Sequence, residues 1–121
     1  MTVMVVNRTR QKVLANRARE ALGFGARFVG LMGRRELPIG EGLILTPCNS
    51  IHTFFMRIPI DALVLDREGV VVKTYLGLAP WRVTGVYRSA RSVVELPAGV
   101  AFASGTQAGD LIFFERSASS F

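Results

Sequence analysis

The sequence predicts a mainly β, single-domain protein built as a β-sandwich or barrel with one or two short helices. The chain has 121 residues, too few for two independent domains, and half of them are apolar, which is enough for one core. From residue 43 onward, short runs rich in Val, Ile, Leu, Phe and Tyr recur at the spacing of a sandwich or barrel. Most of these runs are bounded by Pro, Gly, Asn or Asp, which favour turns.

Six strands are expected in this part of the chain, at residues 43–46, 52–56, 60–65, 70–76, 92–96 and 111–115. The run 60–65 is apolar almost throughout, so we expect it to be covered on both faces as the central strand. The turn Asp66-Arg-Glu-Gly69 predicts a hairpin, because Gly69 can adopt a positive φ.

The amino-terminal part is harder to assign. Residues 2–6 are short and apolar and predict an edge strand, whose free edge could pair two copies of the chain. In residues 11–22, Leu14, Ala18 and Ala21 recur at helical spacing, which predicts a helix. We expect one domain over residues 2–116 and a flexible polar tail at 117–121.

The chain carries a net charge of +6, and its basic residues are concentrated near the start. Within the first 35 residues Glu20 is the only acidic residue, against Arg8, Arg10, Lys12, Arg17, Arg19, Arg27, Arg34 and Arg35. These side chains either solvate an apolar domain or bind an anionic membrane surface or nucleic acid. Nucleic acid is disfavoured, because no aromatic residues for base stacking are interleaved among them.

Cysteine content and hydropathy limit the compartment. Cys48 is the only cysteine, which excludes an intrachain disulfide and a multi-thiolate metal site. No run approaches the roughly 18 apolar residues of a membrane span, and the apolar start is too short for a signal peptide. The chain as written predicts a cytoplasmic protein, unless a longer leader precedes it. The oligomeric state, monomer or dimer, stays open.

Cys48 and His52 are the candidates for catalysis. A thiol near an imidazole is the minimum for nucleophilic catalysis, so one hypothesis is a thiol-dependent enzyme in which His52 is the base. The sequence favours a free cysteine and a loop-capping histidine, because no third orienting group is indicated. A metal site built from Cys48, His52 and Asp61 matches no usual ligand spacing, so we expect neither metal nor cofactor.

Asp61 stands at the entry to the most apolar run, where a carboxylate must be paired or hydrogen-bonded. Its candidate partners are Arg34, Arg57 and Arg82, and an ion pair is favoured over a role as general base.

Trp81 and Arg82 follow a rigid loop that ends in Pro80, and such a ring and guanidinium often form a contact pair at binding surfaces. A tryptophan that closes the end of a barrel is the alternative. The leading hypothesis is a non-catalytic binding or accessory module, with an unknown ligand or protein partner. The expected binding residues are His52, Arg57, Asp61, Trp81, Arg82 and Arg34.

Several ordered motifs together resemble the DUF192 family over residues 11–115. They are GLMGR at 30–34, EGLIL at 41–45, HTFFM at 52–56, PIDALVLD at 59–66, VELPAG at 94–99 and GD at 109–110. The resemblance implies a jelly-roll type of sandwich or barrel, with a strand at 11–19 and a helix at 25–32. It implies no reaction or cofactor, since the family has no established activity.

The resemblance also bears on the candidate residues. Many relatives carry an export signal or membrane anchor and a Trp-Met pair where this chain has Phe55-Met56. They lack the pair of Cys48 and His52, which argues against a catalytic role shared across the family.

Overall fold

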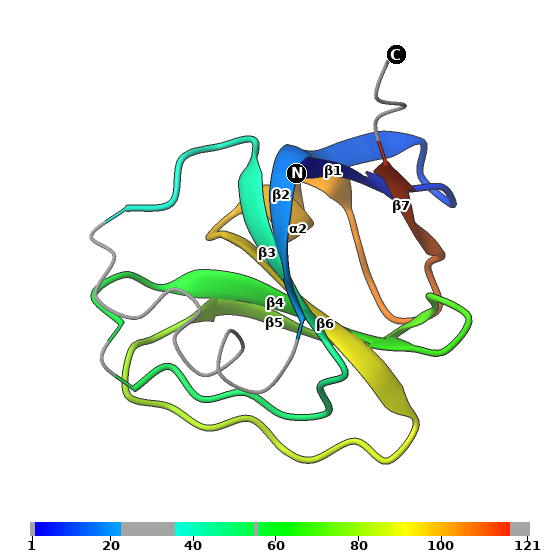
Figure 1. Ribbon diagram of the computed structural model, residues 1–121. Coiled ribbons are helices and arrows are strands. Elements are labelled where there is room, and N and C mark those ends of the chain that lie inside the picture. Colours follow the sequence, from blue (N-terminus) through cyan, green and yellow to red (C-terminus); the bar gives the residue numbers. More distant parts are fainter. Residues whose placement is uncertain (1, 23–35, 55, 117–121) are drawn as a thin grey trace.

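The computed structural model describes residues 2–22, 36–54 and 56–116, which form one seven-stranded mixed sheet and one short helix (Figure 1). The elements are β1 (Thr2–Asn7), β2 (Lys12–Leu22), β3 (Glu41–Thr46), β4 (Ile60–Asp66), β5 (Val71–Leu78), β6 (Ala90–Pro97), α2 (Val100–Ser104) and β7 (Ile112–Arg116). The strand order is β5-β4-β6-β3-β2-β1-β7, and only the β2–β3 pair is parallel. The mainly β prediction is confirmed, but this described part of the chain shows neither a closed barrel nor a two-sheet sandwich.

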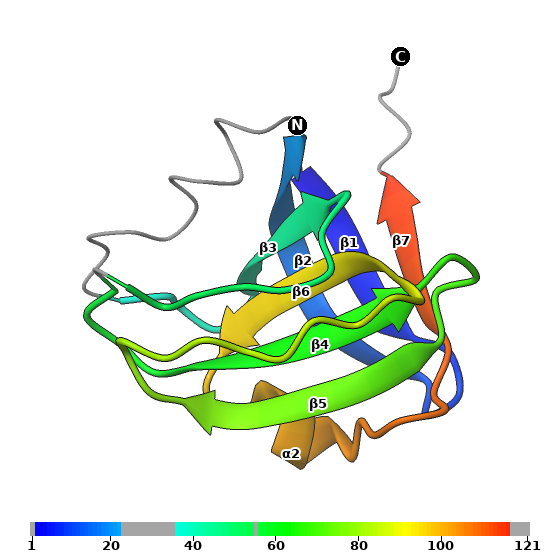
Figure 2. The ribbon, with the colours of Figure 1, turned by 90° about the horizontal axis from the view of Figure 1, so that it is seen from below.

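The sheet curls so that β1, β2 and β7 stand across β4, β5 and β6 (Figure 2). At one end the two edge strands approach each other, because Val70 bridges Leu111 and the Ile112 amide donates to the Gly69 carbonyl at 2.9 Å. Gly69 has φ +85°, and a Cβ there would lie 2.6 Å from the Ile112 carbonyl oxygen, so only glycine fits. The predicted hairpin turn at 66–69 is confirmed, with the carboxylate of Asp66 accepting the amide of Val70 at 2.9 Å.

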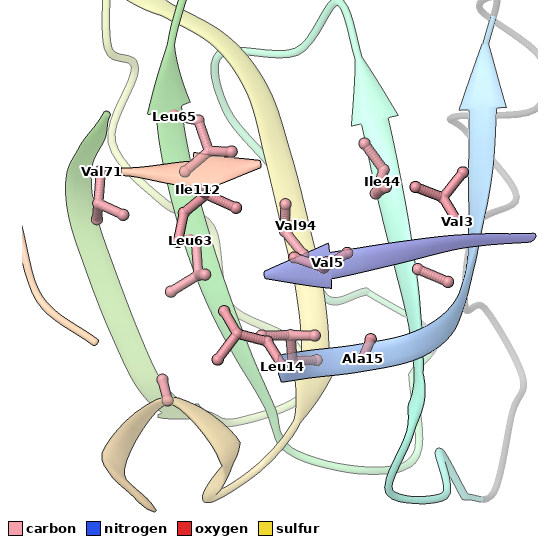
Figure 3. Packing of buried hydrophobic residues seen from close by; sticks show 13 residues of the cluster. Val3, Val5, Leu14, Ala15, Ile44, Leu63, Leu65, Val71, Val94 and Ile112 are labelled. Carbon is pink, nitrogen blue, oxygen red and sulfur yellow. The ribbon is translucent and has the colours of Figure 1, made fainter. Parts of the chain in front are cut away.

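Two hydrophobic cores lie on opposite faces of the sheet. The first core includes Ile44, Leu63 and Val94, packed against residues of β1, β2 and β7 (Figure 3). The second core takes the alternate residues of the same three strands, Leu43 and Ala62 among them. Strands β3, β4 and β6 are therefore buried on both faces, as predicted for residues 60–65. The prediction that this run is central is wrong, because β4 is second from the edge and β3 is the middle strand.

The predicted helix at 11–22 is wrong: these residues form β2, as the family resemblance implies for 11–19. Val3 pairs with Ala18 and Val5 with Ala15, so β2 holds one extra residue in this interval. Such a bulge shifts the phase of the alternation, and buried residues then recur three positions apart, which imitates a helical period.

Two further strand predictions are corrected. Residues 2–6 do not form an edge, because β1 lies between β2 and β7 and has no free edge for a second copy. No strand forms at 52–56 among the residues described there; His52 makes only an isolated bridge. The helix implied at 25–32 and the tail at 117–121 fall outside the described residues.

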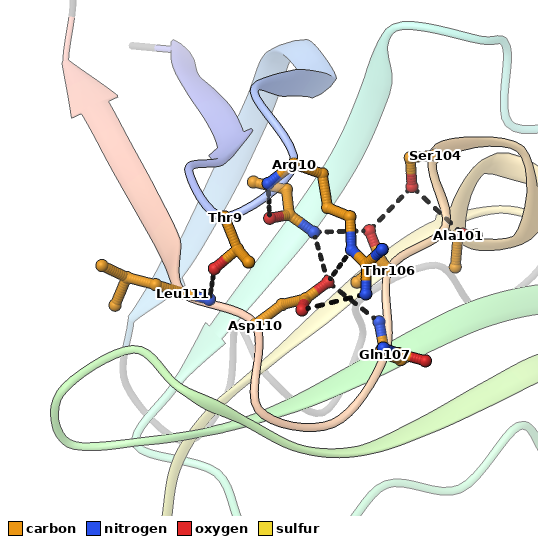
Figure 4. Close-up of polar contacts among 9 residues, drawn as sticks. Thr9, Arg10, Ala101, Ser104, Thr106, Gln107, Asp110 and Leu111 are labelled. Atoms are coloured by element: carbon orange, nitrogen blue, oxygen red, sulfur yellow. Dashed lines mark hydrogen bonds and ion pairs between the residues drawn. The ribbon is translucent and has the colours of Figure 1, made fainter.

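A polar network ties the end of β1 to the loop before β7 (Figure 4). The carboxylate of Asp110 accepts hydrogen bonds from Arg10 Nε at 2.9 Å, from the Asn7 amide at 3.0 Å and from the backbone amide of Gln107 at 3.1 Å. Burial by itself would raise the pKa of Asp110, but these donors outweigh it and hold the pKa below its ordinary value. The Gly109-Asp110 motif therefore has a structural role.

Candidate functional site

A short antiparallel pairing joins residues 51–54 to residues 81–84, and we call this pair of segments the ribbon. His52 faces Val83 in an antiparallel bridge, and the amide of Thr53 donates to a carbonyl of the facing segment at 2.8 Å. The ribbon joins the loop between β3 and β4 to the loop between β5 and β6. Two loops far apart in the sequence are thereby held as one surface.

The ribbon buries two polar side chains and exposes several apolar ones. A strand at a protein surface normally turns its apolar residues inward and its polar residues to solvent. Here Ile51 is buried, but so are the hydroxyl-bearing Thr53 and Thr84. The side chains at the alternate positions form what we call the outer face, and they are His52, Phe54, Trp81 and Val83.

Three rings of the outer face stack in a row. The ring centroids of His52 and Phe54 are 4.9 Å apart, and those of Phe54 and Trp81 are 5.7 Å apart. Trp81 is 56 % exposed and Val83 is 63 % exposed. The alternative that the tryptophan closes the end of a barrel is therefore wrong, because the indole stands in solvent.

Trp81 is held in a strained backbone conformation by Thr53. Its φ is +64°, in the left-handed region that costs a non-glycine residue roughly 1–2 kcal/mol. The carbonyl of the fully buried Thr53 accepts the Trp81 amide at 3.0 Å. The Thr53 hydroxyl donates to the Ala79 carbonyl at 2.7 Å and accepts the Arg82 amide at 2.8 Å. A buried threonine thus fixes the backbone that displays the ring.

Replacing Trp81 by glycine should give a protein about 1 kcal/mol more stable than replacing it by alanine, because only glycine adopts this φ without strain. Denaturant unfolding of the two variants measures the difference. The neighbouring Arg82 provides the control, since it does not share the positive φ and alanine should be the more stable replacement there. Equal stability of the two Trp81 variants would show that no strain is held at this position.

Cys48 and His52 each bond to backbone groups. The Cys48 thiol donates to the Ser50 carbonyl at 3.1 Å, and Nδ1 of His52 accepts the amide of Phe54 at 3.2 Å. A cavity of about 240 Å³ opens beside the thiol, lined by Pro47, Cys48, Asn49, Ser50 and Ala90. The thiol hydrogen and one imidazole nitrogen are thus engaged by the main chain.

Asp61 lies apart from the ribbon and binds main-chain amides. One carboxylate oxygen accepts the Gly77 amide at 2.8 Å, and the other accepts the amides of Gly99 at 3.0 Å and Ala101 at 2.9 Å. Its side chain points from β4 toward the start of α2, on the face of the first core. Neither Arg57 nor Arg82 forms an ion pair with it among the described residues, and Arg34, the third predicted partner, lies outside them, so that part of the prediction stays untested.

The structure describes two of the three arginines that were predicted to bind a ligand. Arg57 and Arg82 are exposed and lie on the two loops that form the ribbon. Arg34 falls outside the described residues. Among the predicted binding residues, the structure therefore gathers His52, Trp81 and Arg82 on the ribbon, with Arg57 close by in sequence.

Glu95 is a second unusual feature that the sequence did not single out. This β6 residue is 4 % exposed and stands on the face of the second core, between Leu43 of β3 and Ala62 of β4. Burial raises the pKa of its carboxyl to about 8, so the group is mostly protonated at neutral pH.

Comparison with known proteins places the chain in a family. The model of DUF192, described as "Uncharacterized ACR, COG1430", matches residues 5–114. The chain belongs to the DUF192 family. A UPF0127 protein of Thermococcus sibiricus is 35 % identical to it over 116 residues, which cover 93 % of this chain and 75 % of the relative. A UPF0127 protein of Pyrococcus furiosus is also 35 % identical and covers 93 % of this chain and 98 % of its own length.

A solved structure shares the fold. The crystal structure of a protein of unknown function from Novosphingobium aromaticivorans has a TM-score of 0.80 and 23 % identity, covering 93 % of this chain and 84 % of the other. At this identity the likeness supports the DUF192 fold alone. The resemblance read from the motifs is thus confirmed, and the family supplies no reaction. In the described part of this DUF192 protein, no helix is long and apolar enough to span a membrane.

Sequence reasoning did not assign functional roles to Phe54, Thr53 and Val83 of the DUF192 protein, although they complete the outer face and hold it in place. The available signal was the alternation at 51–54, where a threonine separates two rings. That pattern alone does not tell which face is buried, because threonine suits either side of a strand.

Proposed function

We propose that this DUF192 protein is a non-catalytic binding module that contacts its ligand through the outer face of the ribbon. The observation that carries the proposal is Trp81, whose ring stands in solvent on a strained backbone fixed by buried Thr53. Strain that the surrounding structure imposes is a signature of functional positions. A tryptophan needed only for packing would be buried.

The exposed residues of the ribbon have a composition that supports a contact role. Tryptophan and arginine are the residues most enriched among those that dominate binding energies, and Arg82 follows Trp81 directly. The stacked rings of His52, Phe54 and Trp81 limit one another's motion, so little side-chain freedom remains to be lost on binding.

The thiol-dependent alternative has less support. A nucleophilic cysteine needs a base that removes its proton, whereas the hydrogen of the Cys48 thiol is directed at the Ser50 carbonyl. Nδ1 of His52 accepts a main-chain amide, and its ring packs on Phe54. These contacts suit a histidine that shapes the ribbon.

Small aromatic carboxylates, such as benzoate and indole acetate, should bind at the ribbon, because they offer a ring to Trp81 and an anion to Arg82. Protein NMR measures this directly, since Trp81 is the only tryptophan and gives a single indole signal. We expect shifts at that signal and at the amides of residues 52–54, and at least a tenfold loss of affinity in Trp81→Ala.

Phe102 supplies the matched control, because its ring is 79 % exposed but lies on α2. Phe102→Ala should leave the binding unchanged. Shifts scattered over the surface, or shifts that depend on Phe102 and not on Trp81, would refute the proposed function.

A further inference from the structure

We propose that the outer face of the ribbon docks on an anionic lipid bilayer, so that the ligand of this binding module is a membrane surface. This inference rests on the proposed function and names its partner. The first argument is the apolar area: besides Phe54, Trp81 and Val83 on the ribbon, Val86 on the same loop is 69 % exposed. Tryptophan prefers the boundary between water and acyl chains, where its ring is buried and its N–H stays hydrated.

The second argument is charge. The two loops that form the ribbon lie in stretches without any acidic residue, from 42 to 60 and from 69 to 94. Of the basic residues in these stretches, Arg57, Arg82 and Arg88 lie on the loops themselves, whereas Lys73 lies on β5 and Arg91 on β6. An apolar patch on loops that carry basic and no acidic residues complements a surface of negatively charged headgroups.

The third argument is that arginines of these two loops have no acidic partner among the described residues. Some other arginines do, as Arg10 pairs with Asp110 at 2.9 Å and Arg17 with Glu41 at 3.7 Å. Within the described residues, Arg57, Arg82 and Arg88 form no ion pair. The cations beside the apolar patch are therefore available for an external anion.

The geometry favours a bilayer over single-stranded nucleic acid. The middle ring of the row, Phe54, is stacked between His52 and Trp81, so the three rings do not offer a run of separate stacking sites for successive bases. The exposed Val83 and Val86 add aliphatic area that cannot stack on bases. A bilayer accepts aliphatic and aromatic side chains alike and needs no matched acidic partner for each arginine.

The test mixes the full chain with vesicles of phosphatidylglycerol and phosphatidylcholine, and with vesicles of phosphatidylcholine alone. Emission of Trp81, the only tryptophan, should shift to shorter wavelength with the anionic vesicles, and the protein should sediment with them. We expect about tenfold weaker binding to neutral vesicles and release as salt rises from about 0.05 to 0.5 M.

Variants locate the contact by sedimentation. Trp81→Ala and the combined Arg57→Ala, Arg82→Ala and Arg88→Ala should each lower vesicle binding at least tenfold, while Phe102→Ala should not. Both sets of changes are at exposed positions, and circular dichroism checks that the fold is kept. Loss of binding in Lys12→Ala with Arg19→Ala instead would place the contact on the arginine-rich amino-terminal third and overturn the inference.

Two further outcomes separate this inference from the proposed function. If aromatic carboxylates shift the indole signal of Trp81 but vesicles do not bind, the membrane is the wrong partner and the binding module stands. The same holds if a glutamate–tyrosine copolymer shifts the Trp81 emission and vesicles do not, which would indicate an acidic protein partner. If the aromatic carboxylates, the vesicles and the copolymer all leave the indole signal and the emission of Trp81 unchanged, both proposals fail.

Discussion

Replacing Glu95 by glutamine should stabilise the protein by about 3 kcal/mol at pH 7 and by about 4–5 kcal/mol at pH 9. The carboxyl is buried on the face of the second core, flanked on the neighbouring strands by Leu43 and Ala62. Burial raises its pKa from 4.5 to about 8. Glutamine keeps the shape of the side chain and is neutral at every pH, so folding no longer carries the cost of holding the carboxyl protonated above its unfolded pKa.

The direction of the pH dependence follows from this shift. The folded protein keeps the proton of Glu95 up to about pH 8, whereas the unfolded chain releases it near pH 4.5. Stability from this group is therefore fully present below pH 4.5 and is lost as the pH rises through 8. The glutamine variant lacks this loss, so its advantage should be small at pH 4 and should grow toward alkaline pH.

Chemical denaturation of both proteins at several pH values between 4 and 9 measures the effect. The exposed Glu115 on β7 supplies the control, since Glu115→Gln should show no such growth with pH. A stability difference between the glutamine variant and the original protein that stays constant with pH would contradict a protonated Glu95.

The strands of the second half of the fold were predictable because their chemistry is local. Residues 60–65 are apolar at every position but Asp61. Such a run avoids water only if other residues cover both faces of the strand, and all six residues are buried. The hairpin at Gly69 was equally readable, because the turn requires a residue that tolerates φ +85°. Each of these signals lies within a few neighbouring residues.

The candidate site was predictable only in part, because its geometry depends on long-range pairing. The exposure of Trp81 follows from its pairing with Thr53, which is remote in the sequence. The hydrogen-bond partners of the Asp61 carboxylate include the amides of Gly77 and Gly99, which come from other parts of the chain. The bulge in β2 likewise arises from pairing with β1 and leaves a misleading helical period in the sequence. Every residue except proline has a main-chain N–H, so the sequence does not show which amides will reach the Asp61 carboxylate. An arginine side chain was therefore the expected partner of Asp61.

Replacing Asp61 by alanine should lower the free energy of unfolding by about 3–5 kcal/mol, because three main-chain amides would lose a charged acceptor. Asp61 is fully buried, and its bond to the Ala101 amide is buried as well, so water replaces the carboxylate poorly at that amide. Its bonds to Gly99 and Ala101 satisfy amides at the start of α2, where Gly99 contributes no side-chain cap. The carboxylate thus joins β4, β5 and the helix at one point.

Asp66 provides a matched control, since its carboxylate also accepts two main-chain amides, those of Glu68 and Val70, but in a turn at the surface. Asp66→Ala should cost about 1 kcal/mol or less, because solvent can reach the freed amides. Asp61→Asn should fall between the two, since an asparagine oxygen can accept on one side while its NH₂ group opposes a donor on the other. Denaturant unfolding measures all three variants, and hydrogen exchange at the amides of Gly77, Gly99 and Ala101 reports the junction itself. Asp61→Ala and Asp66→Ala variants of equal stability would show that the junction at Asp61 contributes no more than a surface turn.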